Sequence, residues 1–145
     1  MRKLRAAVWV AVSMVALSAN AGDRPIVIGE VSSQVARDGV DYAGWVRSAS
    51  EEEVRGLDVS HVPHGKQVIV SVALVRMDTL AETRTTDTTC EISATLRDAK
   101  RGSVFAVLNG KARAKSGGAP RTVELSALQG ALHGALARIP DVLRH

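Results

Sequence analysis

The sequence predicts a two-layer α+β domain, in which an antiparallel sheet of about four strands (order β-α-β-β-β-α) is covered by a long C-terminal helix. Three consecutive extended runs predict most of the sheet, at residues 67–77, 88–97 and 103–113. An apolar stripe at helical spacing then begins near residue 121. A sheet that is apolar on one face must bury that face, and the helix that follows it is the natural cover.

The three extended runs predict an antiparallel meander. The middle run alternates strictly, with its apolar face made by Cys90, Ile92, Ala94 and Leu96. Alternation places one face on the core and the other in water. The first run is apolar on both sides, which is typical of a central strand. In the third run, Phe105 and Val107 share a face with the polar residues Asn109, Lys111, Arg113 and Lys115. Residues 98–102 form a tight hairpin connection that ends in Gly102.

The closing helix is predicted over residues 121–138. Its apolar stripe recurs every three or four positions at Leu125, Leu128, Leu132, Leu136, Ile139 and Leu143. Gly130 and Gly134 cost roughly 1 kcal/mol each against Ala in a helix. We expect them, with the neighbouring alanines 127, 131 and 135, to let the helix lie close to the sheet. Pro140 ends or kinks the helix, because proline lacks the backbone N–H.

The front of the domain is less regular. Residues 24–32 predict a first strand, and turns are expected at Asp38-Gly39 and around Asp41 and Gly44. Two capping boxes, at residues 48–51 and 50–53, predict a short helix. Its buried side would be Val54 and Leu57, with Gly56 near its end.

The N-terminus has the pattern of a secretory signal peptide. A basic start (Arg2, Lys3 and Arg5) precedes an apolar stretch at 6–17 and the cleavage pattern Ala19-Asn20-Ala21. A retained membrane anchor is the alternative, but the apolar stretch is shorter than the roughly 20 residues a membrane span needs. We therefore expect a signal peptide at 1–21 and one exported domain at 22–145, periplasmic or extracellular. No Cys follows the apolar stretch, so lipid attachment is not expected.

Composition narrows the function classes. The chain has 19 Lys and Arg against 15 Asp and Glu. Removal of the signal peptide takes away Arg2, Lys3 and Arg5, which leaves 16 basic residues and a nearly balanced charge. The remaining charge is polarised: residues 23–96 carry 7 basic and 12 acidic groups, whereas residues 97–145 carry 9 and 3. A basic half favours anionic partners such as lipid headgroups or polyanions, although solvated strand and loop positions are the simpler explanation. Aromatic residues are scarce, which argues against a nucleic-acid partner that stacks bases.

A few residues are candidates for chemistry. Cys90 is the single cysteine, so no internal disulfide is possible, and its apolar neighbours predict a buried, inert thiol. The His61-x-x-His64 pair is a conceivable start of a metal site, completed by His133 or His145, but no Cys-x-x-Cys accompanies it and a solvated loop explains it better. His133 itself lies at the border of the helical stripe.

The acidic run at 51–53 could indicate a cation site, but no loop of further ligands surrounds it. Helix capping explains the run better. The sequence has no phosphate-binding loop, no nucleophile elbow and no paired-carboxylate signature. We therefore predict no catalytic residues, no cofactor and no metal, and a protein that is not an enzyme.

The meander and terminal helix resemble small bacterial envelope domains: periplasmic domains of curli-secretion-channel proteins, penicillin-binding-protein activator lipoproteins and the N-terminal domain of the Tol translocation protein. The resemblance covers residues 66–140 and rests on three segments, at 68–74, 92–102 and 127–139. It differs at 33–65, where those domains have a long helix, and in lacking their lipoprotein Cys. The resemblance implies protein–protein work in the envelope and transfers no site residues.

The leading hypothesis is a non-enzymatic periplasmic or secreted domain that binds an unidentified envelope protein through a sheet edge or the polar sheet face. A cystatin-like protease inhibitor is the alternative, on a faint likeness of residues 67–71 to the inhibitory hairpin of that class. A hydrolase with an unrecognised site is the third; a pocket joining His61, His64 or His133 to an acid would favour it.

Overall fold

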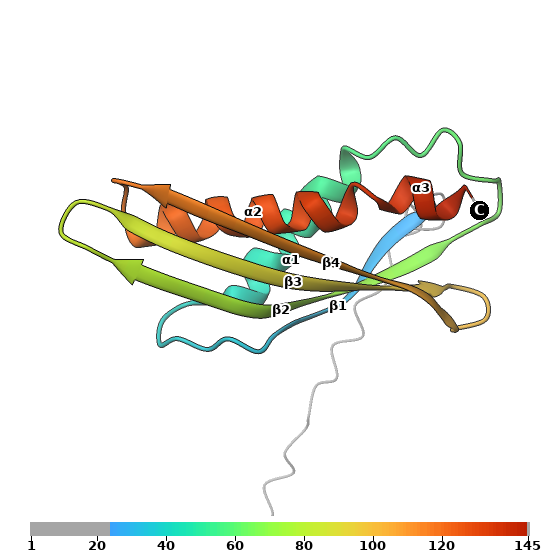
Figure 1. Ribbon diagram of the computed structural model, residues 1–145. Helices are drawn as coiled ribbons and strands as arrows, with labels where there is room; N and C mark the ends of the chain where they lie inside the picture. The colour runs from blue at the N-terminus through green and yellow to red at the C-terminus, as the bar shows by residue number, and fades with distance from the viewer. Residues whose placement is uncertain (1–23, 145) are drawn as a thin grey trace, which may run out of the picture.

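The computed structural model describes residues 24–144, so the predicted signal peptide and His145 lie outside the described residues. The chain forms a sheet with helices in the order expected from the sequence (Figure 1). The elements are β1 (Ile26–Ser33), α1 (Tyr42–Arg55), β2 (Val68–Ala81), β3 (Thr86–Asp98), β4 (Val104–Ser116), α2 (Pro120–Leu136) and α3 (Ile139–Leu143).

The sheet has the strand order β1-β2-β3-β4 and is mixed. β2, β3 and β4 form the predicted antiparallel meander, whereas β1 pairs with β2 in parallel. The sequence predicted an antiparallel sheet, and this prediction is wrong for the β1–β2 pair, which is parallel. The reason lies in α1, because a helix between two strands carries the chain back to the end where the first strand began.

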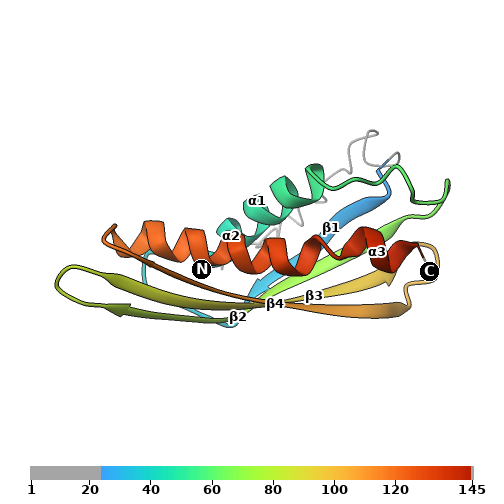
Figure 2. The same cartoon turned by 45° about the horizontal axis from the view of Figure 1, so that its top comes forward.

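All three helices cover one face of the sheet, and the other face carries no helix (Figure 2). The core lies between these two layers and is almost entirely aliphatic. Leu128, Leu132 and Leu136 of α2 are fully buried, as are the sheet residues Ile92 and Leu96 beneath them (0–1% exposed). The two-layer α+β class with a C-terminal helix on the sheet is therefore confirmed.

α1 is longer than the sequence indicated. It begins at Tyr42, where the Asp41 carboxylate accepts a hydrogen bond from the Gly44 N–H at 3.0 Å as an N-cap. The expected turn at Asp41 and Gly44 is therefore wrong, and so are the capping boxes, because Ser48 to Glu53 lie inside the helix. The turn at Gly39 (φ +76°) and the helix end at Gly56 are confirmed.

α2 and α3 replace the single closing helix. α2 ends at Leu136, and α3 starts at Ile139 with Pro140 in its first turn, so the expected break near this proline is confirmed. Ile139 and Leu143 are buried as predicted. Leu125 is only half-buried, because the buried side of α2 includes Val123 and Glu124 instead.

The close approach of α2 to the sheet depends on a glycine in the strand. A Cβ on Gly110 of β4 would lie 2.0 Å from the Ala131 carbonyl oxygen, which leaves no room for a side chain. In the helix, a Cβ on Gly130 would meet the Ala112 Cβ at 3.0 Å, whereas Gly134 faces open space. The expected small-residue contact therefore exists, but Gly134 has no part in it and Gly110 is the tightest point.

Candidate functional site: the free edge and open face of the sheet

The open face of the sheet is largely neutralised by ion pairs between neighbouring strands. Lys111 Nζ lies 3.2 Å from Glu91 Oε1, and Arg113 Nε donates to Asp87 Oδ1 at 2.9 Å. The hydrogen bonds from Arg113 hold the pKa of Asp87 below its usual value and, reciprocally, raise the pKa of Arg113. Glu91 and Asp87 on β3 lie close to Lys111 and Arg113 on β4, so these pairs favour the observed register of the two strands.

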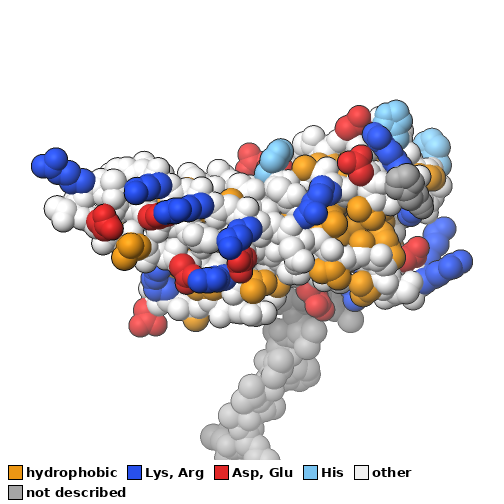
Figure 3. All heavy atoms as spheres, viewed as in Figure 1, with side chains coloured by type: hydrophobic (Ala, Val, Ile, Leu, Met, Phe, Trp, Pro, Cys, Tyr) orange, Lys and Arg blue, Asp and Glu red, His pale blue; other side chains and the backbone are white. Residues whose placement is uncertain are grey.

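The start of β4 is different, because three large apolar side chains are exposed there. Val104, Phe105 and Val107 have 56%, 44% and 54% of their surface exposed. Lys66 Nζ lies 6.0 Å from the centre of the Phe105 ring. Hydrophobic side chains gather at this end of the molecule, over β4 and α3 (Figure 3). Scattered exposed apolar residues are ordinary, so the grouping of three on one strand makes this part of β4 a candidate interaction surface.

β4 is also an edge strand. Within residues 24–144, no strand pairs with the side of β4 that faces away from β3. The Asn109 carbonyl accepts a hydrogen bond from Arg138, so it points away from β3. In an antiparallel strand, alternate residues direct both backbone groups to the same side. Val107, Lys111 and Arg113 therefore present their N–H and C=O groups to the free edge.

The opposite side of the sheet is covered more fully. β1 has eight residues, and its pairing with β2 shifts register between Ile28 and Val31. Past Ser33, the second half of β2 has no strand beside it in the described chain, but the loop after β1 follows it there. The Gln34 N–H of this loop bonds the Leu74 carbonyl at 2.9 Å. The outer side of β2 is therefore partly occupied by the chain's own backbone.

Arg37 holds this loop against the molecule. Its Nη1 lies 2.8 Å from Oε1 of Glu124, a residue of α2 that is 1% exposed. Tyr42 and Thr79 donate to the same carboxylate at 3.2 and 2.7 Å. Burial, followed by the charge of Glu124, raises the pKa of Tyr42. Every donor around the buried carboxylate comes from a different segment, so Glu124 ties α1, β2 and the loop to α2.

Glu124 was not among the residues singled out by the sequence pattern. Its position in the helix could have indicated its burial. Glu124 lies four residues before Leu128, so the two residues share a helix face, and that face is buried in place of the one with Leu125.

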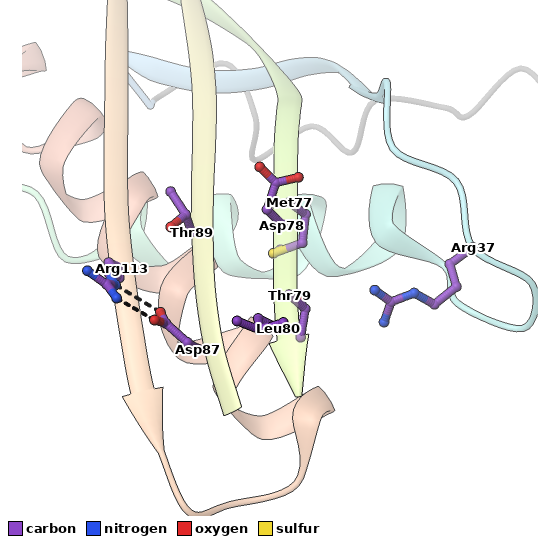
Figure 4. Close-up of a pocket in the computed structure, with 8 residues that line it drawn as sticks. All are labelled: Arg37, Met77, Asp78, Thr79, Leu80, Asp87, Thr89 and Arg113. Carbon is purple, nitrogen blue, oxygen red and sulfur yellow. Dashed lines mark hydrogen bonds and ion pairs between the residues drawn. The ribbon is translucent and has the colours of Figure 1, made fainter. Parts of the chain in front are cut away.

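A groove of about 460 Å³ lies between Arg37 and the ends of the central strands (Figure 4). Figure 4 shows Arg37 reaching from its loop toward β2, while Arg113 and Asp87 face one another across β4 and β3. Asp78 and Leu80 are exposed beside them. The cations and carboxylates of this groove are already engaged in ion pairs, which leaves no reactive pair for chemistry.

The candidate residues from the sequence are scattered by the fold. Cys90 is fully buried under α2, as predicted, and burial raises its pKa to about 12, so the thiol is neutral. His61 and His64 are exposed in the loop between α1 and β2. Across residues 24–144, no three His, Cys, Asp or Glu side chains come together in a way that could hold a metal ion.

His133 is the exception that meets an acid. Its Nδ1 lies 3.2 Å from Glu53 Oε2, in an open hollow of about 370 Å³ between α1 and α2. Gln129 and Glu52 line the same hollow, but no Ser, Thr or Cys does. Such a pair can transfer a proton through water, and no nucleophilic side chain accompanies it.

The segment proposed as an inhibitory hairpin is not a hairpin. Residues 68–71 open β2, and Val68 and Val70 are buried in the core. None of the helices in the described part of the chain is both long and apolar enough to cross a membrane.

Comparison with known proteins gives relatives only at the level of fold. No family model matches the chain, and no curated protein matches it. Among solved structures, a PelC dodecamer from Paraburkholderia phytofirmans matches with a TM-score of 0.52 and 14% identity over 79% of this chain and 89% of that one. The hypothetical protein CT253 from Chlamydia trachomatis matches with a TM-score of 0.54 and 8% identity over 81% and 96%.

A putative lipoprotein from Caulobacter crescentus CB15 matches with a TM-score of 0.50 and 13% identity over 86% of this chain and 92% of that one. At these identities the likeness establishes the shared α+β fold.

Proposed function

We propose that this protein is a non-enzymatic interaction domain of the bacterial cell envelope, and that it binds a protein partner along the free edge of β4. The observation that carries the proposal is the 13-residue β4 itself, with an open backbone edge beside exposed Val104, Phe105 and Val107. An open edge is a template for an added strand, in which main-chain hydrogen bonds give affinity and side-chain contacts give specificity.

The envelope location is supported by two independent observations. The N-terminal sequence has the basic start, apolar stretch and cleavage pattern of an exported protein. One protein of the same fold is described as a putative lipoprotein. The resemblance to curli-channel, penicillin-binding-protein-activator and Tol domains points to the same class. N-terminal sequencing of the exported protein should begin at Gly22; a product that retains Met1 to Ala21 would contradict export by cleavage.

A proline substitution in β4 tests whether a partner strand pairs with its free edge. Val107→Pro removes one N–H that points away from β3, so it should prevent strand addition without breaking the β3–β4 ladder. Ser93→Arg on the open face of β3 is the matched control, because it adds bulk and charge to the face and leaves the edge intact. Both variants should first show the far-ultraviolet circular dichroism of the parent.

Each variant is then cross-linked in its native envelope and purified with its partner, which is identified by mass spectrometry. We expect one partner to be lost with Val107→Pro and retained with Ser93→Arg. If the partner is retained by Val107→Pro and lost by Ser93→Arg, the proposed edge binding is refuted and the polar face of the sheet is the binding surface.

A hydrolase is the second candidate, and the His133–Glu53 contact of 3.2 Å is the observation that favours it. A general base needs hydrogen-bond reach to the water that it activates, and His133 lies in an open hollow that solvent can enter. A hydrolytic activity on ester, amide or glycoside substrates that disappears in His133→Ala would establish it. The inhibitor alternative is weaker, since the segment at residues 68–71 is buried in β2.

A further inference from the structure

A basic pocket of about 510 Å³ lies at the end of the sheet, where the loop before β2 meets the β3–β4 hairpin. Its lining residues come from the start of β1, the loop and the hairpin: Arg24, Pro25, Val59, Ser60, Val62, Pro63, His64, Gly65, Lys66, Gln67 and Lys100. Figure 3 shows histidines and Lys or Arg side chains at this end of the molecule, with acidic side chains among them.

Backbone hydrogen bonds fix the walls of this pocket. The loop turns at Gly65, whose φ of +81° suits glycine, and the Lys66 N–H bonds the Pro63 carbonyl at 3.2 Å. The Ala99 N–H bonds the Gln67 carbonyl at 3.0 Å, which attaches the hairpin to the loop. The pocket is therefore part of the folded domain, although its walls come from three separate segments.

The side chains that line this pocket carry positive charge only. Arg24, Lys66 and Lys100 line it, and no carboxylate does. None of the ion pairs found within residues 24–144 involves these three side chains.

Two acids close in sequence to the lining residues, Asp58 and Asp98, accept hydrogen bonds from their own loops. Asp58 accepts the Ser60 hydroxyl at 2.6 Å, and Asp98 accepts the N–H groups of Lys100 and Arg101 at 2.8 and 3.0 Å. These hydrogen bonds lower the pKa of both carboxyls, so both stay ionised in their own contacts. Asp98 also interacts with the charge of Lys100, whereas no acid is paired with Arg24 or Lys66 in the described residues. Like charges held around one cavity raise the local concentration of anions.

We propose that this pocket binds a phosphate group. Three cationic side chains, together with His64, supply donors from several directions, as a tetrahedral oxyanion requires. The exposed Val104 and Phe105 lie on the adjoining strand, and Lys66 contacts the Phe105 ring. The phosphate therefore comes either from a soluble phosphate ester or from the headgroup of an anionic lipid whose chains meet these apolar residues.

The first arm of the test uses inorganic phosphate and nuclear magnetic resonance. Sodium phosphate is titrated against sodium chloride of equal ionic strength, and we expect amide shifts at Gly65, Lys66 and Lys100. The double variant Lys66→Gln/Lys100→Gln should weaken the phosphate affinity roughly tenfold or more, because charge-assisted hydrogen bonds are lost. Lys115→Gln, at the far end of β4, is the matched charge control and should leave the affinity unchanged.

The second arm separates the two sources with vesicles. Phosphatidylglycerol and phosphatidylcholine vesicles are sedimented with the full-length exported domain. Binding to phosphatidylglycerol alone, lost in the double variant, supports a lipid source; phosphate shifts at the pocket without vesicle binding support a soluble phosphate ester.

Three results would overturn the site: no shifts and no vesicle binding, shifts equal in chloride and phosphate, or an equal loss of affinity with Lys115→Gln. The Val107→Pro test of the β4 edge does not involve these side chains, so the two proposals fail separately.

Discussion

The two edges of this sheet are treated differently by the fold. The β1 side is short, irregular between Ile28 and Val31, and continued by a loop that Arg37 attaches to the buried Glu124. The β4 side is a long strand whose outward carbonyl at Asn109 meets only the side chain of Arg138 among the described residues. Proteins protect sheet edges with bulges, charges and covering loops, because an open edge pairs with other chains. The difference teaches that β4, rather than β1, is the edge left available.

The largest expected effect comes from changing how β4 is attached to α2. Gly110→Ala places a methyl group 2.0 Å from the Ala131 carbonyl, so strand and helix must separate. Overpacking of this kind costs about 3 kcal/mol of unfolding free energy or more. Gly134→Ala is the control, because the added methyl meets open space and alanine favours the helix by about 1 kcal/mol. Urea unfolding of both variants measures the contrast; equal effects would refute the close approach at Gly110.

The second prediction concerns the loop after β1, which Glu124 holds against the outer side of β2. Glu124→Gln removes the charge that Arg37, Tyr42 and Thr79 all donate to, and the new amide N–H₂ faces hydroxyl and guanidinium donors. We expect a loss of about 1–3 kcal/mol in unfolding free energy. Faster amide exchange in residues 34–41 should accompany it.

Glu53→Gln, at the more exposed contact with His133, is the matched control and should change stability by less than about 0.5 kcal/mol. Unchanged exchange in the loop would show that Glu124 does not hold it.

The smallest effect belongs to the ion pairs beside the open edge. Asp87 has its pKa lowered from 3.8 by the hydrogen bonds of Arg113, so its stabilisation is present above that value and is lost as the pH falls through the lowered pKa. Asp87→Asn should therefore reduce stability slightly at neutral pH and by less at about pH 2. Thermal unfolding at both pH values compares the two proteins, and a difference that is equally large in acid would contradict the ion-pair account.

The sequence predicted the elements whose patterns are local. The alternation from Cys90 to Leu96 determined both the β3 faces and the burial of the thiol, and the leucine spacing identified α2. α1 was underestimated because the Ser-Glu pairs resemble a helix start, while the actual N-cap is Asp41, well before Ser48.

The features that the sequence did not predict depend on contacts between distant segments. Glu124 is buried only because donors from residues 37, 42 and 79 surround it. Gly110 is required because the Ala131 carbonyl of α2 lies directly over it. From the sequence alone, a glycine in a strand indicates only that the strand packs weakly there. The open β4 edge likewise follows from the strand order, which no single segment determines.

Amide hydrogen exchange of β4 tests the central claim most directly, measured on the isolated domain and on its complex with the partner identified by cross-linking. The outward N–H groups of Val107, Lys111 and Arg113 should exchange quickly in the isolated domain and become protected in the complex. Unchanged exchange at these three amides, with new protection at β1 or on the open face of β3, would contradict the account.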